Sequence, residues 1–219
     1  MTESYTAHPR YSRAERIADA VVHVLGLIFG LAACVSLAIA AWPSNDALLH
    51  LALALYGLGL LAMLGCSALY NLSNHGRWKV VFRRLDHAAI FVMIAGTYTP
   101  FMVIVLGDGW GYGLLAFVWT VALAGVALKL FWPHRLDRLS VAAYLLLGWS
   151  IVVAAGPLIG AVSAAGLVLL TVGGALYSLG VVFHLWNRLP YQNAIWHAFV
   201  LAAAACHFSA VFSEVALAG

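Results

Sequence analysis

Apolar runs longer than about 18 residues recur along the whole chain, and they constrain its fold more than any other feature. Hydrophobic residues make up 64% of the 219 residues and charged residues only 9%. The helices of a water-soluble bundle each need a polar face, which these runs lack. The sequence therefore predicts an all-α integral membrane protein.

Turn-forming residues divide the apolar runs into seven predicted transmembrane helices. Trp-Pro-Ser-Asn-Asp at 42–46 separates the first two, and Gly-Asp-Gly at 107–109 separates the third from the fourth. Gly156 and Pro157 are expected to end the fifth helix, and a short basic loop is expected to lead into the third. The predicted bounds are about 17–41, 46–72, 84–106, 110–131, 138–155, 161–185 and 192–216.

Basic residues lie on one side of these helices. All eleven precede the first helix or fall in alternate connections: Arg10, Arg13, Arg16, Arg77, Lys79, Arg83, Arg84, Lys129, Arg135, Arg138 and Arg188. Because cytoplasmic connections retain Lys and Arg, the pattern predicts a cytoplasmic N-terminus and an external C-terminus. Residues 1–16 are interpreted as a cytoplasmic N-terminal segment and residues 17–219 as one seven-helix transmembrane domain.

Polar residues gather at the predicted cytoplasmic ends of the helices. An ionisable residue there is costly next to lipid, so it marks a functional site by default. We expect one inner pocket to collect residues of the first, second, third, sixth and seventh helices: Glu15, Asp19, His23, Ser67, Asn71, Asp86, His87, His184, Asn193 and His197.

Two interpretations of this pocket remain open. His and Asp ligands from several helix ends, with an open position for water, describe a catalytic zinc centre. Asp86 and His197 are candidate ligands, and further histidines could join them: His23, His75, His87, His184 and His207. In the other interpretation the polar groups hydrogen-bond one another and lock the helices together, at about 0.5–2 kcal/mol each.

Other residues have simpler interpretations. Arg83 and Arg84 are expected to meet anionic lipid phosphates. His207 is expected to be a buried neutral histidine with a hydrogen-bond partner, and Pro100 to end or kink the third helix.

The sequence also excludes some functions. A retinal protein needs a lysine in its last helix, and the only lysines are Lys79 and Lys129. A cytoplasmic N-terminus is unlike that of G-protein-coupled receptors, and no predicted helix carries the charged stripe of a pore. A transport function remains an alternative, although the sequence shows no obvious internal repeat. Membrane lipids are the expected partners, with no nucleic acid, and the oligomeric state is left open.

Five blocks of sequence resemble one known family. RRLDHAAIFVMIAGTYTPF at 83–101 resembles the signature of the bacterial hemolysin III branch of the progestin and adipoQ receptor (PAQR) proteins. The other blocks are ERIADAVVHVLG (15–26), SALYN (67–71), GGALYSLGVVFH (173–184) and NAIWHAFVLAAAACHF (193–208). The resemblance implies a multi-pass protein of the bacterial cell (inner) membrane with a zinc site near its cytoplasmic face. Through similarity to alkaline ceramidases, it also implies lipid-amide hydrolase chemistry.

The chain departs from the family pattern at the metal ligands. The resemblance implies histidine ligands at 71, 193 and 197 with Asp86 beside them, but Asn71 and Asn193 occupy two of these positions. Asp19 also stands where the family usually has Asn. Too few ligands remain for tight zinc binding unless another histidine contributes.

We therefore expect a hemolysin III-type protein of membrane-lipid homeostasis with a degenerate metal pocket. The alternative is a zinc-dependent intramembrane hydrolase of lipid amides or esters, with Asp86 and Ser67 as its catalytic residues.

Overall fold

The computed structural model describes residues 11–73, 76–132 and 137–217 of the chain. This described part contains helices and no strand, which confirms the predicted all-α class. Seven helical segments in it are long and apolar enough to cross a membrane: Arg13–Ala41, Ala47–Leu72, Trp78–Leu106, Gly109–Phe131, Leu139–Ala161, Ala164–Leu185 and Gln192–Ala216. The orientation of the termini and the domain division at residue 16 stay predictions.

The first two helices begin with side-chain caps. Helix α1 (Arg13–Ala41) starts with a capping box, in which the Ser12 hydroxyl accepts from the Glu15 N–H and the Glu15 carboxylate accepts from the Ser12 N–H. Helix α2 (Ala47–Leu72) starts at Asp46, whose carboxylate accepts from a backbone N–H at 2.8 Å. The polar stretch at 42–46 is therefore both the turn and the start of α2.

Helix α3 (Arg77–Pro100) begins earlier than predicted, so the assignment of Arg83 and Arg84 to a loop was wrong. The prediction followed apolar content, but a helix can project beyond the apolar layer when its long basic side chains reach toward the polar surface. Lys79 also holds the preceding chain by donating to the Ser73 carbonyl at 3.2 Å.

Pro100 ends α3, and the span continues as a π-helix, η1 (Phe101–Leu106). Proline has no N–H for the carbonyl four residues back, so the α-helical bonding pattern cannot continue through it. This confirms the predicted role of Pro100. Gly107 then takes the left-handed conformation that favours glycine, at φ 59°, and α4 (Gly109–Phe131) follows.

The prediction that Gly156 and Pro157 end the fifth span was wrong. That span runs through α5 (Asp137–Trp149), a 3₁₀ segment η2 (Ser150–Ala154) and α6 (Ala155–Ala161). Pro157 lies in the first turn of α6, where its missing N–H would have no helical partner in any case.

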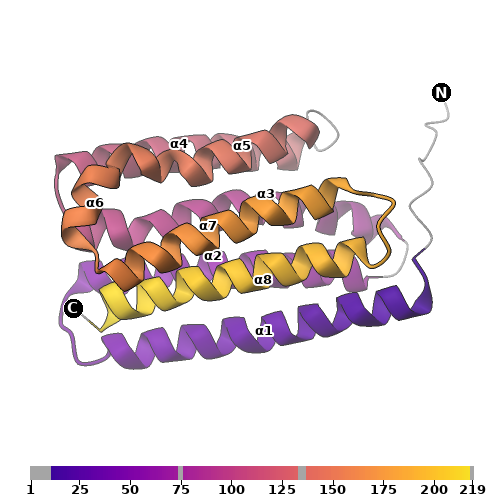
Figure 1. Ribbon diagram of the computed structural model, residues 1–219, viewed down its shortest axis with the longest axis horizontal. Coiled ribbons are helices and arrows are strands. Elements are labelled where there is room, and N and C mark those ends of the chain that lie inside the picture. Colours follow the sequence, from indigo (N-terminus) through magenta and orange to yellow (C-terminus); the bar gives the residue numbers. More distant parts are fainter. Residues whose placement is uncertain (1–10, 74–75, 133–136, 218–219) are drawn as a thin grey trace.

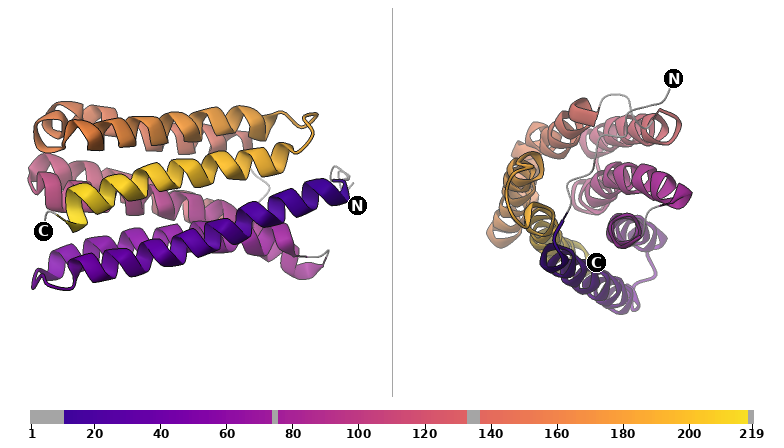
Figure 2. Two further views of the ribbon diagram at one scale, coloured as in Figure 1. Left: turned by 60° about the horizontal axis from the view of Figure 1, so that its bottom comes forward. Right: turned by 90° about the vertical axis from the view of Figure 1, so that its right-hand side faces the viewer.

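The last two spans are α7 (Ala164–Leu185) and α8 (Gln192–Val211), the second extended by a π-helical turn, η3 (Phe212–Ala216). The helices lie side by side along the long axis of the molecule (Figure 1) and form a ring when viewed along that axis (Figure 2). Helix α1 packs against both α2 and α8, so the first and the last of the described helices meet.

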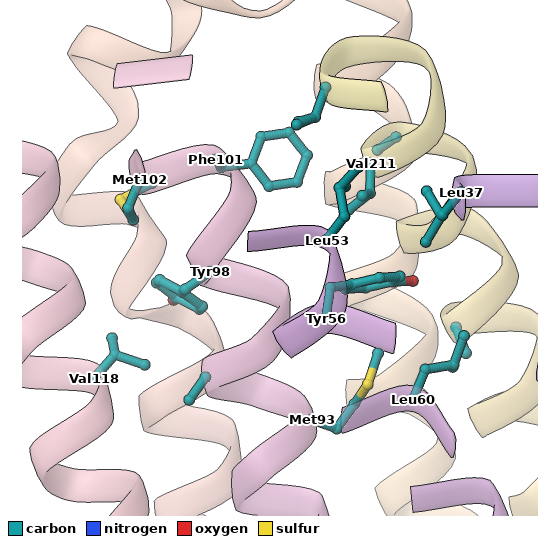
Figure 3. Close-up of a cluster of buried hydrophobic side chains, with 14 of the residues drawn as sticks. Leu37, Leu53, Tyr56, Leu60, Met93, Tyr98, Phe101, Met102, Val118 and Val211 are labelled. Atoms are coloured by element: carbon teal, nitrogen blue, oxygen red, sulfur yellow. The ribbon is translucent and has the colours of Figure 1, made fainter. Parts of the chain in front are cut away.

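The hydrophobic core lies around α2 and α3 (Figure 3). Tyr56 and Leu60 of α2 are fully buried, and Met93 of α3 and Val211 of α8 pack in the same cluster. The outward face of α1 instead exposes large apolar side chains such as Ile28. This distribution suits a bundle whose outer surface meets lipid.

The close contact between α3 and α4 at Gly125 generates a prediction. A Cβ added to Gly125 would lie 2.4 Å from the ring of Phe91, which is buried and packs edge-on against Tyr144. We expect Gly125→Ala to lower the free energy of unfolding by about 1–3 kcal/mol because the ring has no room to move. Thermal unfolding in detergent measures the effect.

Gly113→Ala on the same helix is the matched control, since no atom lies within 4 Å of its added Cβ. That variant should stay within about 0.5 kcal/mol of the unaltered protein. Equal melting temperatures for the two variants would show that the contact is not tight.

Candidate functional site

The polar residues predicted to share a pocket do meet at one end of the bundle. The N-terminal halves of α1, α3 and α8 and the C-terminal ends of α2 and α7 bring them to the wall of one cavity. The packing of α1 against α8 contributes most to this arrangement, because it places the face of α1 that bears Asp19 against the start of α8. His75, a candidate ligand, lies outside the described residues.

Asp19 is the centre of the cluster. One carboxylate oxygen accepts the Nδ1 hydrogen of His197 at 2.7 Å, and the other accepts from the Asn193 amide at 3.0 Å. Asp19 is only 7% exposed. The carboxylate therefore ties α1 to α8 with two hydrogen bonds, one of them an ion pair when His197 is protonated.

His23 and His197 both direct Nε2 at the hydroxyl of Ser67. The Nδ1 of His23 lies 2.8 Å from the Asp19 backbone carbonyl, which can only accept, so Nδ1 carries the hydrogen. The Nδ1 of His197 donates to the Asp19 carboxylate in the same way. The two Nε2 atoms face Ser67 Oγ at 3.3 Å and 3.5 Å.

Asn71 and Asn193 take part as hydrogen-bond donors. The Asn193 amide donates to Asn71 Oδ1 at 3.1 Å as well as to Asp19. The Asn71 amide then donates to the Ser67 carbonyl at 3.0 Å and approaches Ser67 Oγ at 3.4 Å. Each asparagine thus presents N–H groups to the cluster.

Asp86 approaches Ser67 from α3. It lines the same cavity as Ser67, His197 and Arg83. The predicted site residues Asp86, Ser67 and His197 therefore do lie together. The hydrogen bonds of the cluster converge on Asp19, however, and not on Asp86, which was predicted as a ligand and a catalytic residue.

The remaining predicted residues lie at the rim. Glu15 accepts from the Tyr191 N–H at 2.9 Å and so links α1 to the start of α8. His184 lines the cavity, and its buried Nδ1 has no hydrogen-bond partner. Arg83 and Arg84 line it too, and Arg84 donates to the Leu130 carbonyl at 3.3 Å. Their predicted contact with lipid phosphates stays a prediction.

Two further residues complete the surroundings. Tyr11, just before α1, donates to the Gln192 amide oxygen at 3.3 Å. Burial, with a smaller effect of the Asp19 charge, raises the pKa of Tyr11, so its hydroxyl keeps the proton that it donates. His207 lies near Leu170 and bonds its carbonyl at 3.3 Å, which confirms the predicted partnered histidine.

A cavity of 1870 Å³ leads from the cluster into the bundle. Its wall includes Asn193 and His207, which are 14 residues apart on α8, a distance of about 21 Å along the helix. Aromatic and apolar side chains line the deeper part, among them Tyr98, Trp149 and Tyr177. The cavity therefore joins a polar end to a long, mostly apolar interior.

Comparison with known proteins identifies relatives along nearly the whole chain. A profile of the family described as Haemolysin-III related matches residues 12–208. Hemolysin-3 of Bacillus cereus is 39% identical over 215 residues, covering 98% of each chain. The Hemolysin-3 homolog of Bacillus subtilis (strain 168) is 39% identical over 197 residues, covering 90% of this chain and 92% of the relative.

A human relative is more distant. Monocyte to macrophage differentiation factor of Homo sapiens is 28% identical over 167 residues, covering 72% of this chain and 68% of the relative. No solved structure matches the chain significantly.

The donor set fits a hydrogen-bonded cluster better than the zinc centre that the resemblance implies. Among the described residues, Asp19, His23 and His197 could offer ligand atoms within 4.8 Å of one another. The Nε2 atoms of both histidines stay available to a metal, but at 71 and 193 the chain presents amide hydrogens, which repel a cation, in place of the two imidazoles that the resemblance implies.

Metal content tests this assignment. We expect the unaltered protein, purified in detergent, to hold no stoichiometric zinc by elemental analysis. We expect the Asn71→His/Asn193→His double variant to bind about one zinc per chain, because three imidazoles and an open position form a zinc site. About one zinc in the unaltered protein would contradict the assignment.

Proposed function

The chain belongs to the haemolysin-III related family, and from that premise we propose that it binds a membrane lipid inside its helix bundle as part of membrane-lipid homeostasis. The proposed location is the bacterial cell membrane, which the relatives in two Bacillus species support. The observation that carries the proposal is the cavity. At 1870 Å³ it exceeds the roughly 300–1,000 Å³ of a pocket for a drug-sized ligand.

The distribution of polar groups in the cavity matches an amphipathic ligand. The acidic, imidazole and amide groups lie at the end that the basic residues mark as cytoplasmic, where a lipid presents its polar part. The deeper wall can accept an acyl chain. A lipid bound in this way would keep the head-to-tail order that it has in the bilayer.

Unpaired polar atoms on the wall also support a ligand. The Tyr177 hydroxyl, Arg84 Nε and His184 Nδ1 are buried without a hydrogen-bond partner, and all three residues line the cavity. Such an atom costs about 1–3 kcal/mol unless something bonds it. Arg84 and His184 lie near the polar end, so their partners on a lipid would belong to its headgroup.

The wall between α5 and α7 offers a route to the bilayer. Trp149 of α5 donates to the Ser178 hydroxyl of α7 at 2.9 Å, and both residues line the cavity. Trp149 is also 40% exposed, so the wall is not sealed at this residue. We infer that an acyl chain enters between these two helices.

The second candidate is a zinc-dependent hydrolase of lipid amides or esters. It is favoured by one observation, the Asp19, His23 and His197 group that could offer ligand atoms to a metal. The elemental analysis above separates the two candidates, because the hydrolase requires bound zinc and the lipid-binding function does not.

Filling the cavity tests the proposed function. Gly148 of α5 lines the cavity, and no atom lies within 4 Å of an added Cβ, so Gly148→Phe would occupy space without an immediate clash. We expect lipid that co-purifies with the protein, counted by native mass spectrometry, to fall at least about fivefold, or about 1 kcal/mol.

Gly113→Phe is the matched control, because Gly113 is equally free of neighbours and does not line the cavity. It should retain the lipid. Equal retention by both variants, or an unaltered protein that carries no lipid, would reject binding in this cavity.

A further inference from the structure

We propose that Ser67, His197 and Asp19 form a metal-independent catalytic triad that cleaves a carboxylic ester of the bound lipid. The inference rests on the proposed function only for the place of the lipid. It assigns Ser67 as the nucleophile, His197 as the general base and Asp19 as the residue that positions the base.

The three residues have the connectivity that such a triad requires. Asp19 accepts the Nδ1 hydrogen of His197 at 2.7 Å, and Nε2 of the same ring faces Ser67 Oγ at 3.5 Å. The carboxylate thereby fixes the tautomer whose Nε2 lone pair can take the serine proton. Nucleophile–base distances are often this long without substrate and shorten when it binds.

The hydroxyl of Ser67 lies close to nitrogen atoms that can accept its proton. Its hydroxyl has one hydrogen but faces two imidazole acceptors, His23 Nε2 and His197 Nε2. The hydroxyl also lies on the wall of the cavity. A carbonyl of a lipid seated there with its chain in the apolar interior would come within reach of Oγ.

His197 is the base, although His23 Nε2 is slightly nearer to the hydroxyl. The Nδ1 of His197 bonds a carboxylate, whereas that of His23 bonds a neutral backbone carbonyl. When a ring takes up the serine proton, the carboxylate stabilises the resulting charge far more than a carbonyl does.

Asn71 and Asn193 support the triad. Asn193 donates to both the Asp19 carboxylate and Asn71 Oδ1, which holds the carboxylate and turns the Asn71 amide toward Ser67. The Asn71 Nδ2 lies 3.4 Å from Ser67 Oγ. It is therefore placed to donate to the oxyanion that forms on the carbonyl attacked by Oγ.

The reaction balances with water as the co-substrate. Ser67 Oγ bonds to the ester carbonyl carbon while its proton moves to His197 Nε2. The bond from carbon to the alcohol oxygen breaks, and His197 returns the proton to that oxygen, which leaves an acyl-serine. Water attacks the acyl carbon, gives a proton to His197, and the carbon–Oγ bond breaks with the proton returning to Ser67. The products are a carboxylic acid and an alcohol.

A fluorophosphonate with a long alkyl chain tests the triad in the full chain, because its phosphorus captures an activated serine hydroxyl. We expect a covalent adduct on Ser67, located by peptide mass spectrometry and formed equally with a metal chelator present. Ser209→Ala is the control that should label normally, since Ser209 lies on the exposed face of α8 and bonds only its own helix. No adduct on Ser67, or an adduct lost on chelation, overturns the proposal.

Asp19→Asn tests the positioning role. We expect the maximal labelling rate to fall at least about a hundredfold, since an amide no longer fixes the tautomer of His197. The probe concentration that gives the half-maximal rate should stay within about twofold of that of the unaltered protein. A collapsed pocket would change this concentration as well as the maximal rate. Fast labelling of Asp19→Asn overturns the assignment, as does labelling abolished by His23→Gln but not by His197→Gln.

Failure of the triad and failure of lipid binding are separable. An unlabelled Ser67 in a protein that still carries lipid overturns the triad and leaves the proposed function intact. A labelled Ser67 in a protein without lipid supports the triad and rejects lipid storage in the cavity.

Discussion

The buried bond between Asp19 and His197 is the interaction on which the site depends. It joins α1 to α8, the first and last helices, at 2.7 Å, and both side chains are largely buried. Removing either side chain altogether is destabilising because the other buried polar group is left without its partner. The pair therefore favours the register of the two helices in which His23 and His197 face Ser67.

The seven-helix fold and the gathering of polar residues at one end could be predicted from the sequence. Each apolar run was long enough to span a membrane, and each polar residue near its end needed a hydrogen-bond partner. Asp19 and His23 are four residues apart, which places both on one face of α1, and in the structure His23 meets Ser67 while Asp19 meets His197. Which residue would be central could not be predicted. Spacing fixes neighbours within a helix, whereas the bond from Asp19 to His197 depends on α1 packing beside α8.

The errors in helix bounds have a physical cause of the same kind. The start of α3 was placed by apolar content, but hydrogen bonding continues the helix through residues whose basic ends reach polar surroundings. Pro157 was interpreted as a terminator, although a proline in a first turn is compatible with a helix. Both helix boundaries depend on the local pattern of backbone hydrogen bonds, which the amino-acid composition does not indicate.

The two asparagines affect both the ability of the cluster to bind a metal and the pattern of its hydrogen bonds. Imidazoles at 71 and 193 would offer lone pairs to a cation, whereas amides offer hydrogens, and those hydrogens go to Asp19 and Ser67. The acidic residue at 19 supplies negative charge near His197 and accepts the Nδ1 hydrogen of its ring. In this chain, the donors and acceptors that the structure brings together bond one another across α1, α2 and α8.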